Sequence, residues 1–263
     1  MAIYVVSDLH GAHDRLTKAV PDGAVLLLLG DLVNLIDYRT RTGILYEVFN
    51  AEAVDQVSAL RAKGDYESAR DVIQTRGEGR QEEIRADIGR RVAEECAAVF
   101  AALPDPTYLI LGNVDSPPLA KALADENPSV RLADGRVVEL EGERFGFVGG
   151  ALPTPLHVAG EVTEEEMRAK VESLDEVDVL CSHIPPAVPE LCFDTLAGKA
   201  EFGSKDLLRY IEDVQPRRAY FGHVHQPLVS SMHIGRTLCV NVGYFRATGR
   251  AFPHVSTSGG TGD

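Results

Sequence analysis

The sequence predicts an α/β domain, and three observations lead to this fold class. Short runs rich in Val, Leu, Ile and aromatic residues recur along the chain, and each ends at Gly, Ser, Asp or Asn, as buried strands do. Helical patterns lie between several of these runs. The chain has 263 residues, of which 44% are hydrophobic, and this is enough for a single large domain over residues 1–263.

The elements follow from these patterns in chain order. Apolar runs predict strands over 2–7, 24–29, 107–111, 144–148, 177–181 and 218–221, with further strands at 136–140, 228–232 and 237–242. Helical spacing predicts helices over 12–19, 163–173 and 204–213. The last two strands form a hairpin around Gly235, and the C-terminal strands suggest a second, partly antiparallel sheet packed on the first. Residues 256–263 are predicted to be a disordered tail.

Residues 44–103 differ from the rest and predict a helical insertion between the second and third strands. They contain no strand-like run, and apolar residues recur at helical spacing. Asn50 and Asp65 are suitable N-caps, with breaks at Gly64 and Gly77, so two or three amphipathic helices are expected. We interpret the charged helix faces as solvated surface; a lid over a site, a protein-binding face and a dimerisation surface stay open as alternatives.

Charge and cysteine content restrict the partners and the compartment. The net charge of −14 opposes binding to long nucleic acid or to an anionic membrane, and a phosphate-bearing substrate would need metals or an arginine cluster. No run of eighteen apolar residues predicts a membrane span, and no signal peptide is recognised. Four scattered cysteines without a C-x-x-C spacing predict reduced thiols in a cytoplasmic protein, namely Cys96, Cys181, Cys192 and Cys239.

Five predicted strands end in residues that can bind metal. Ligands bind at the carboxyl ends of strands in α/β sheets, and each of these side chains alone could equally be an ordinary strand end or turn. Together they supply seven N and O donors and no thiolate, a set that suits Zn, Fe, Mn, Co or Ni and fits two ions sharing a carboxylate. The residues are Asp8, His10, Asp31, Asn113, His183, His223 and His225.

The ordered set D-x-H, G-D, G-N-x-D, S-H and G-H-x-H resembles the calcineurin-like metallophosphoesterase superfamily, in particular its compact bacterial members. The resemblance runs from residue 1 to about residue 245, apart from the insertion. It implies a four-layer α-β-β-α sandwich. It also implies that Asp8, His10, Asp31 and His225 hold one metal ion, while Asp31, Asn113, His183 and His223 hold the other.

The resemblance implies a phosphoesterase with two divalent ions, most readily Mn, Fe or Zn. Such ions hold a bridging water, lower its pKa, and let the resulting hydroxide attack phosphorus in line. We expect a small-molecule phosphate ester as substrate and prefer a phosphodiester. A phosphomonoesterase or nucleotide phosphohydrolase is the alternative activity, and a non-catalytic metal-binding interaction scaffold is the alternative of another class.

One position departs from the family pattern. Many members carry a histidine that is assigned to protonating the leaving group, and this chain has Val114 there. Valine cannot transfer a proton, which argues against esters with poor leaving groups. The position resembles the subset of the family with a small residue other than histidine, and this is the reason for slightly preferring diesters. His13 and His157 are the spare candidates for a proton donor, with an exposed loop histidine as the alternative for each.

Two further predictions concern side chains beside the ligands. Arg39 and Arg41 follow the second strand and could clamp a substrate phosphate, the alternative being solvated arginines at the start of the insertion. Asp115 is predicted to position the loop of Asn113 by hydrogen bonding rather than to bind metal.

Overall fold

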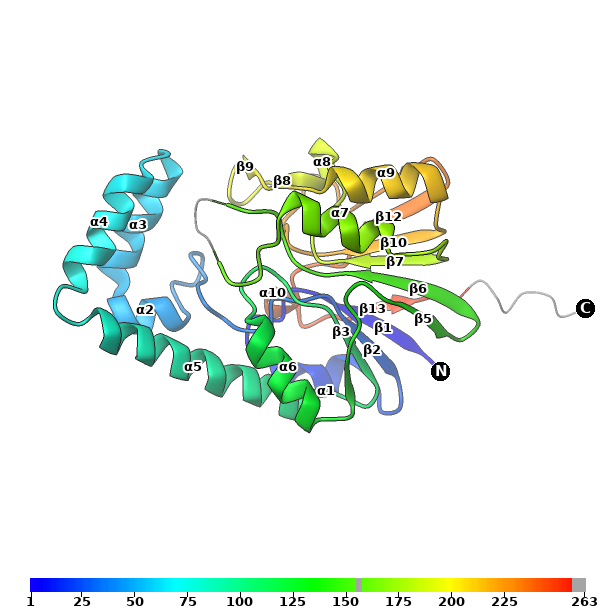
Figure 1. Cartoon of the computed structure of the whole chain (residues 1–263), viewed down its shortest axis with the longest axis horizontal. Helices are drawn as coiled ribbons and strands as arrows, with labels where there is room; N and C mark the ends of the chain where they lie inside the picture. The colour runs from blue at the N-terminus through cyan, green and yellow to red at the C-terminus, as the bar shows by residue number, and fades with distance from the viewer. Residues whose placement is uncertain (155–157, 257–263) are drawn as a thin grey trace, which may run out of the picture.

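The computed structural model describes residues 1–154 and 158–256, which form two β-sheets packed face to face with helices outside them (Figure 1). The first sheet has the strand order β13-β1-β2-β3-β4. Strands β1 to β4 run parallel, and β13 lies antiparallel to β1 at one edge. The strands are β1 Ile3–Val6, β2 Val25–Leu28, β3 Thr107–Leu109, β4 Val130–Leu132 and β13 Phe252–His254.

The second sheet has the order β11-β12-β10-β7-β6-β5. Its four central strands are parallel, and an antiparallel hairpin forms each edge. The hairpin predicted around Gly235 is β11–β12, and Gly235 has a φ of 58°, which glycine adopts readily. The strands are β5 Val137–Leu140, β6 Glu143–Val148, β7 Val179–Ser182, β10 Arg218–Phe221, β11 Ser231–Ile234 and β12 Thr237–Asn241. A short separate hairpin pairs β8 Phe193–Asp194 with β9 Lys199–Ala200.

The core between the sheets explains the continuous apolar strand sequences. Val5 and Leu27 of the first sheet meet Phe145 of the second in this space, and all three are fully buried. Leu26 and Leu28 of the same strand β2 pack on its other face, against helices. A strand covered on both faces needs apolar side chains at every position, which is what β2 shows.

Helices form the two outer layers, so the predicted α-β-β-α sandwich is confirmed (Figure 1). Helices on the first sheet are α1 Leu16–Ala19, preceded by the 3₁₀ turn His13–Arg15, then α5 Gln81–Ala102, α6 Pro117–Glu126 and α10 Phe245–Thr248. Helices on the second sheet are α7 Glu164–Glu172, α8 Pro189–Cys192 and α9 Lys205–Val214.

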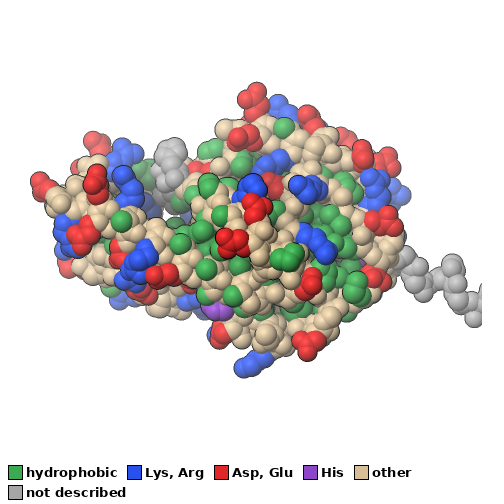
Figure 2. All heavy atoms as spheres, turned by 60° about the horizontal axis from the view of Figure 1, so that its bottom comes forward, with side chains coloured by type: hydrophobic (Ala, Val, Ile, Leu, Met, Phe, Trp, Pro, Cys, Tyr) green, Lys and Arg blue, Asp and Glu red, His purple; other side chains and the backbone are tan. Residues whose placement is uncertain are grey.

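The insertion contains four helices rather than two or three. They are α2 Ile44–Phe49, α3 Ala51–Ala62, α4 Tyr66–Arg76 and α5. Asn50 and Asp65 cap α3 and α4 as predicted, each accepting a backbone hydrogen bond. The pair α3–α4 projects away from the sheets, whereas the C-terminal half of α5 returns to the core (Figure 1). Acidic and basic side chains are mixed over this arm (Figure 2), which agrees with a solvated surface.

Seven elements of the described chain were not predicted from the sequence, namely β4, α6, α8, β8, β9, α10 and β13. Strands β4 and β13 are only three residues long, and β13 contains Pro253. Long-range contacts hold β13 in place, because His254 donates to Glu143 over 2.9 Å and Tyr220 donates to His254 over 3.0 Å. Such contacts leave no local pattern in the sequence.

Two other expectations concern the whole chain. Among the described residues, none of the helices combines the length and apolar character that crossing a bilayer requires. The predicted tail 256–263 lies outside the described residues, apart from Ser256.

Candidate metal centre

The side chains that were predicted as metal ligands come together where the two sheets meet. Loops after β1, β2 and β3 bring Asp8, His10, Asp31 and Asn113 from the first sheet, and loops after β7 and β10 bring His183, His223 and His225 from the second. Two groups result, in each of which the candidate ligand atoms lie within 4.8 Å of one another. The first group is Asp8, His10 and His225; the second group is Asp31, His183 and His223.

Asp31 lies between the two groups. Its Oδ2 atom is 3.6 Å from Nε2 of His10, and its Oδ1 atom is 3.7 Å from Nε2 of His183. One carboxylate oxygen therefore faces each group. This geometry fits a carboxylate that is shared by two ions.

Asn113 adds an oxygen to the second group. Its Oδ1 atom lies 3.2 Å from Nε2 of His183 and 3.0 Å from Nδ1 of His223. The amide oxygen thus points at the same space as both imidazoles.

Backbone carbonyls orient two of the histidines. Nδ1 of His10 lies 3.1 Å from the carbonyl oxygen of Val33, and Nδ1 of His183 lies 2.7 Å from that of Leu29. Because a carbonyl can only accept, each Nδ1 carries the hydrogen, and each Nε2 presents a lone pair to the site. Neutral imidazoles held in this way are ready metal ligands.

The pKa shifts of His10, His223 and Asp8 favour the forms that can bind a metal ion. Burial lowers the pKa of His10 to about 4 and that of His223 to about 3, so both are neutral at pH 7. Burial acts to raise the pKa of Asp8, but the hydrogen bond and charge of His225 outweigh it and hold that pKa below its usual range. Burial raises the pKa of Asp31. Buried imidazole lone pairs beside buried carboxylates form a donor set that a divalent cation would satisfy.

The backbone is strained at four of the predicted ligands. Asp8, His10, Asp31 and His223 have φ values of 56°, 41°, 54° and 67°, in the left-handed region that residues other than glycine rarely adopt. The amide of His10 donates to the carbonyl of Asp31 over 2.8 Å, which ties the first two loops together. Strain of this kind persists where surrounding contacts enforce it, and it is concentrated at functional sites.

Gly222 explains how the histidine loop approaches Asp8 so closely. A Cβ atom at this position would collide with the side chains of Ser7 and Asp8. The amide of His223 instead donates to both carboxylate oxygens of Asp8, over 3.2 and 3.0 Å. Glycine before the first histidine therefore lets the second sheet reach the ligands of the first.

Asp115 positions the ligand loops, as the sequence suggested. Its carboxylate accepts hydrogen bonds from the amides of Gly112, Asp31 and Leu32 over 2.7, 2.9 and 2.8 Å. Burial, with the nearby charge of Asp31, raises its pKa to about 6. One buried carboxylate thus fixes the loops after β2 and β3 relative to each other.

Asp115→Ala should weaken metal binding about 10- to 100-fold, because the loops that carry Asp31 and Asn113 lose their common acceptor. Three buried amides without partners should also lower the free energy of unfolding by about 3 kcal/mol or more. Metal titration by calorimetry and denaturant unfolding would measure both effects. Asp125→Ala is a matched control, since Asp125 forms an exposed ion pair with Lys121 on α6. Unchanged metal affinity in Asp115→Ala would contradict the positioning role.

The remaining predicted residues are placed differently. The amide of Val114 donates to Oδ1 of Asp31 over 3.1 Å, and its side chain packs into the outer core of the first sheet. His13 lies on the 3₁₀ turn before α1, and in the described part of the chain no hydrogen bond or ion pair joins it to a predicted ligand. His157 lies outside the described residues.

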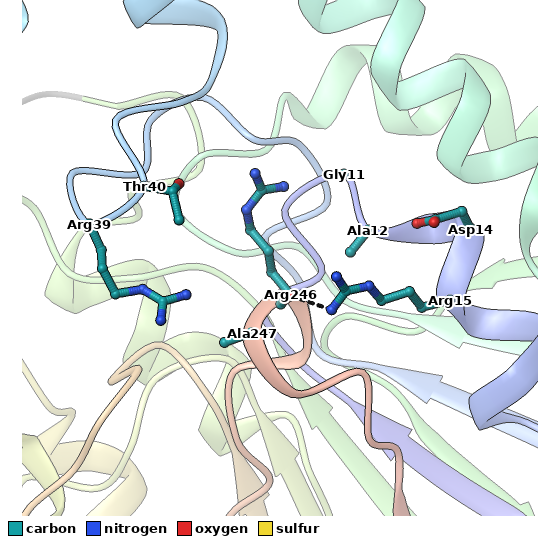
Figure 3. Close-up of a pocket in the computed structure, with 8 residues that line it drawn as sticks. All are labelled: Gly11, Ala12, Asp14, Arg15, Arg39, Thr40, Arg246 and Ala247. Carbon is teal, nitrogen blue, oxygen red and sulfur yellow. Dashed lines mark hydrogen bonds between the residues drawn. The ribbon is translucent and has the colours of Figure 1, made fainter. Parts of the chain in front are cut away.

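The two arginines that were predicted to clamp a substrate phosphate are placed apart. Arg41 forms an ion pair with Asp55 of α3, whereas Arg39 lines a cavity (Figure 3).

Tyr244 is a neighbour of the centre to which sequence reasoning assigned no role. Its ring stacks on His225 with centroids 3.9 Å apart, and it meets His10 edge-on at 5.6 Å. Its hydroxyl donates to Asp37 over 3.4 Å. Residues 241–245 lie within the range of the family resemblance, but the contact of Tyr244 with His225 is seen only in the folded chain, where the segment leads into α10.

Comparison with known proteins agrees with this geometry. The family model described as calcineurin-like phosphoesterase matches residues 1–227, a range that contains all seven predicted ligands. The chain belongs to this family. The phosphoesterase is therefore a metal-dependent hydrolase, and its two groups of candidate ligands agree with the two ions that the family uses.

Other comparisons concern the fold alone. One crystal structure, among 24 matching chains, is similar to this phosphoesterase with a TM-score of 0.58 and 17% identity. The likeness covers 93% of this chain and 92% of the other. No curated protein sequence matches the chain.

Proposed function

We propose that this phosphoesterase hydrolyses a small-molecule phosphodiester at a centre of two divalent metal ions. The observation that carries the proposal is the position of Asp31, which directs one carboxylate oxygen toward each group of candidate ligands. A shared carboxylate between two sets of imidazole ligands is the arrangement that two-metal hydrolysis requires.

The proposed ligand sets extend the two groups by the shared residues. The first ion would be held by Asp8, His10, Asp31 and His225, and the second by Asp31, Asn113, His183 and His223. Mixed N and O donors support Mn, Fe or Zn. We place the activity in the cytoplasm, and the four buried cysteines, none of them in a disulfide, support this.

The chain's own residues would prepare the site for the reaction. When bound, the ions would lower the pKa of a water molecule and offset the charge on the phosphoryl oxygens. The carbonyls of Val33 and Leu29 keep His10 and His183 in the ligating tautomer, and Asp115 holds Asp31 in register with Asn113. Because these groups are already in place, no free energy is needed to reorganise the site during the reaction.

Val114 supports a diester with a good leaving group rather than a monoester with a poor one. The valine side chain is packed into the core and carries no proton to transfer. Positioned proton transfer raises the rate about 10²- to 10⁴-fold, so its absence slows the hydrolysis of esters with poor leaving groups most. Phosphomonoesterase or nucleotide phosphohydrolase activity is the alternative outcome of the test below.

Hydrolysis of bis-p-nitrophenyl phosphate and p-nitrophenyl phosphate tests the proposal. Purified protein should turn over both substrates with added Mn²⁺, should prefer the diester in kcat/KM, and should lose activity with a chelator. Restored activity on returning Mn²⁺ would separate metal loss from damage, and Asp31→Asn would report background turnover. Absence of metal-dependent turnover of either substrate would defeat the proposal, and preference for p-nitrophenyl phosphate would support the monoester alternative.

A further inference from the structure

Figure 3 shows a cavity of about 330 Å³ whose wall includes residues of the loop after β1. Gly11, which follows the predicted ligand His10, forms part of its wall. Arg246 forms another part, and its Nη1 atom donates to the carbonyl of His10 over 2.6 Å. The backbone amide of Arg246 also donates to the carbonyl of Asp8 over 3.2 Å. The cavity and the centre thus share the loop after β1.

Three arginines line this cavity. Figure 3 shows Arg15 and Arg39 extending toward each other from opposite sides, with Arg246 between them. Arg246 is anchored, since its Nε atom lies 3.5 Å from Oδ2 of Asp37. Arg15 donates to the carbonyl of Arg246 over 2.9 Å, which holds its guanidinium at the cavity.

The charges in the cavity are not balanced by the protein. Asp37 offsets Arg246, and the exposed Asp14 also contributes to the wall. Across residues 1–154 and 158–256, no carboxylate forms an ion pair with Arg15 or Arg39. Arg15 and Arg39 are exposed side chains, and with Arg246 they outnumber Asp14 and Asp37, so the cavity carries positive charge in a chain whose net charge is −14. A bound anion would supply the missing negative charge.

We propose that this arginine cavity binds a second phosphate group of the substrate. The inference rests on the proposed function: the phosphate to be cleaved lies at the metal centre, and the second phosphate lies between Arg15 and Arg39. Guanidinium groups bind phosphate through paired hydrogen bonds, and arginine is suited to this because its donors form a rigid fork. The substrate class is therefore a phosphate ester that carries a second phosphate.

Anion binding can be measured apart from catalysis. After chelator treatment, calorimetric titration of the full chain with inorganic pyrophosphate measures anion binding at the arginine cavity. The empty ligand sets do not contribute, because their carboxylates repel anions. Arg39→Ala and Arg15→Ala should each weaken binding about tenfold, the loss expected for one charged hydrogen-bonding partner. Arg250→Ala makes the same charge change on an exposed side chain outside the cavity and should keep wild-type affinity. Equal affinity in wild type and Arg39→Ala would overturn the proposal.

Kinetics with the Mn²⁺-loaded enzyme distinguish a substrate phosphate from a free anion. Two chromogenic diesters form a matched pair, namely the p-nitrophenyl ester of thymidine 5′-phosphate with and without a 3′-phosphate. The 3′-phosphate should raise kcat/KM about tenfold, and Arg39→Ala, but not Arg250→Ala, should remove this advantage. Equal kcat/KM for both esters would overturn the substrate assignment even if pyrophosphate binds. Failure of the proposed function looks different, since neither ester would then be hydrolysed while arginine-dependent pyrophosphate binding persists.

Discussion

Asp31→Asn is expected to reduce Mn²⁺-dependent hydrolysis at least about 100-fold and to remove one bound ion from each chain. Asparagine has almost the shape of aspartate, but only one of its two terminal atoms can bind a metal. In the wild type, Oδ1 of Asp31 accepts from the amide of Val114 over 3.1 Å. The asparagine oxygen should keep this hydrogen bond, so its NH₂ group would replace Oδ2 and face His10.

The first ion, beside His10, should therefore be lost before the second. Metal content by mass spectrometry and steady-state turnover would be measured on the same preparation. Asp22→Asn is the matched control, because Asp22 is exposed in the loop before β2. Two ions and wild-type turnover in Asp31→Asn would exclude Asp31 as the shared ligand.

Gly112→Ala should lower kcat/KM at least about 100-fold although it changes no ligand. A Cβ atom at this position would lie 2.6 Å from Cε1 of His183 and closer still to Oδ1 of Asp31. Real Cβ atoms do not approach so closely, so the loop after β3 must shift away from both side chains. Displacing ligands from two sheets at once should disrupt the site even where the fold survives.

Circular dichroism and thermal unfolding of Gly112→Ala would separate a damaged site from a damaged fold. Gly89→Ala provides the control, because Gly89 lies in α5 and an added Cβ would meet no atom within 4 Å beyond the chain neighbours and nearby backbone of the helix itself. That variant should keep full activity and gain up to about 1 kcal/mol of helix stability. Gly222→Ala should cause a similar loss of activity, because its Cβ atom would collide with Asp8. Full activity in Gly112→Ala would show that the ligand loops are not packed as tightly as described.

The sequence by itself determined the layers of the fold and the chemical character of the centre. Strands such as β2 and β10 were recognisable because burial on both faces demands a continuous apolar run, which is a local property. The polar residues that follow them were recognisable for the same reason, since each stands directly after its strand. Caps such as Asn50 are also local and were predicted correctly.

Only the tertiary structure decided how the strand ends are distributed and what surrounds them. The five ends belong to two sheets rather than one, and Asp31 faces both groups because the sheets pack across a common core. Tyr244 reaches His225, and Arg246 joins Arg15 and Arg39, only because α10 returns to the loop after β1. The contacts of Arg246 with His10 and Arg15 join residues more than 200 positions apart, whereas sequence periodicity reports only on neighbours within a few turns of chain. The arginine cavity and the stacked tyrosine are therefore products of packing, while the candidate ligand residues can be recognised in the sequence.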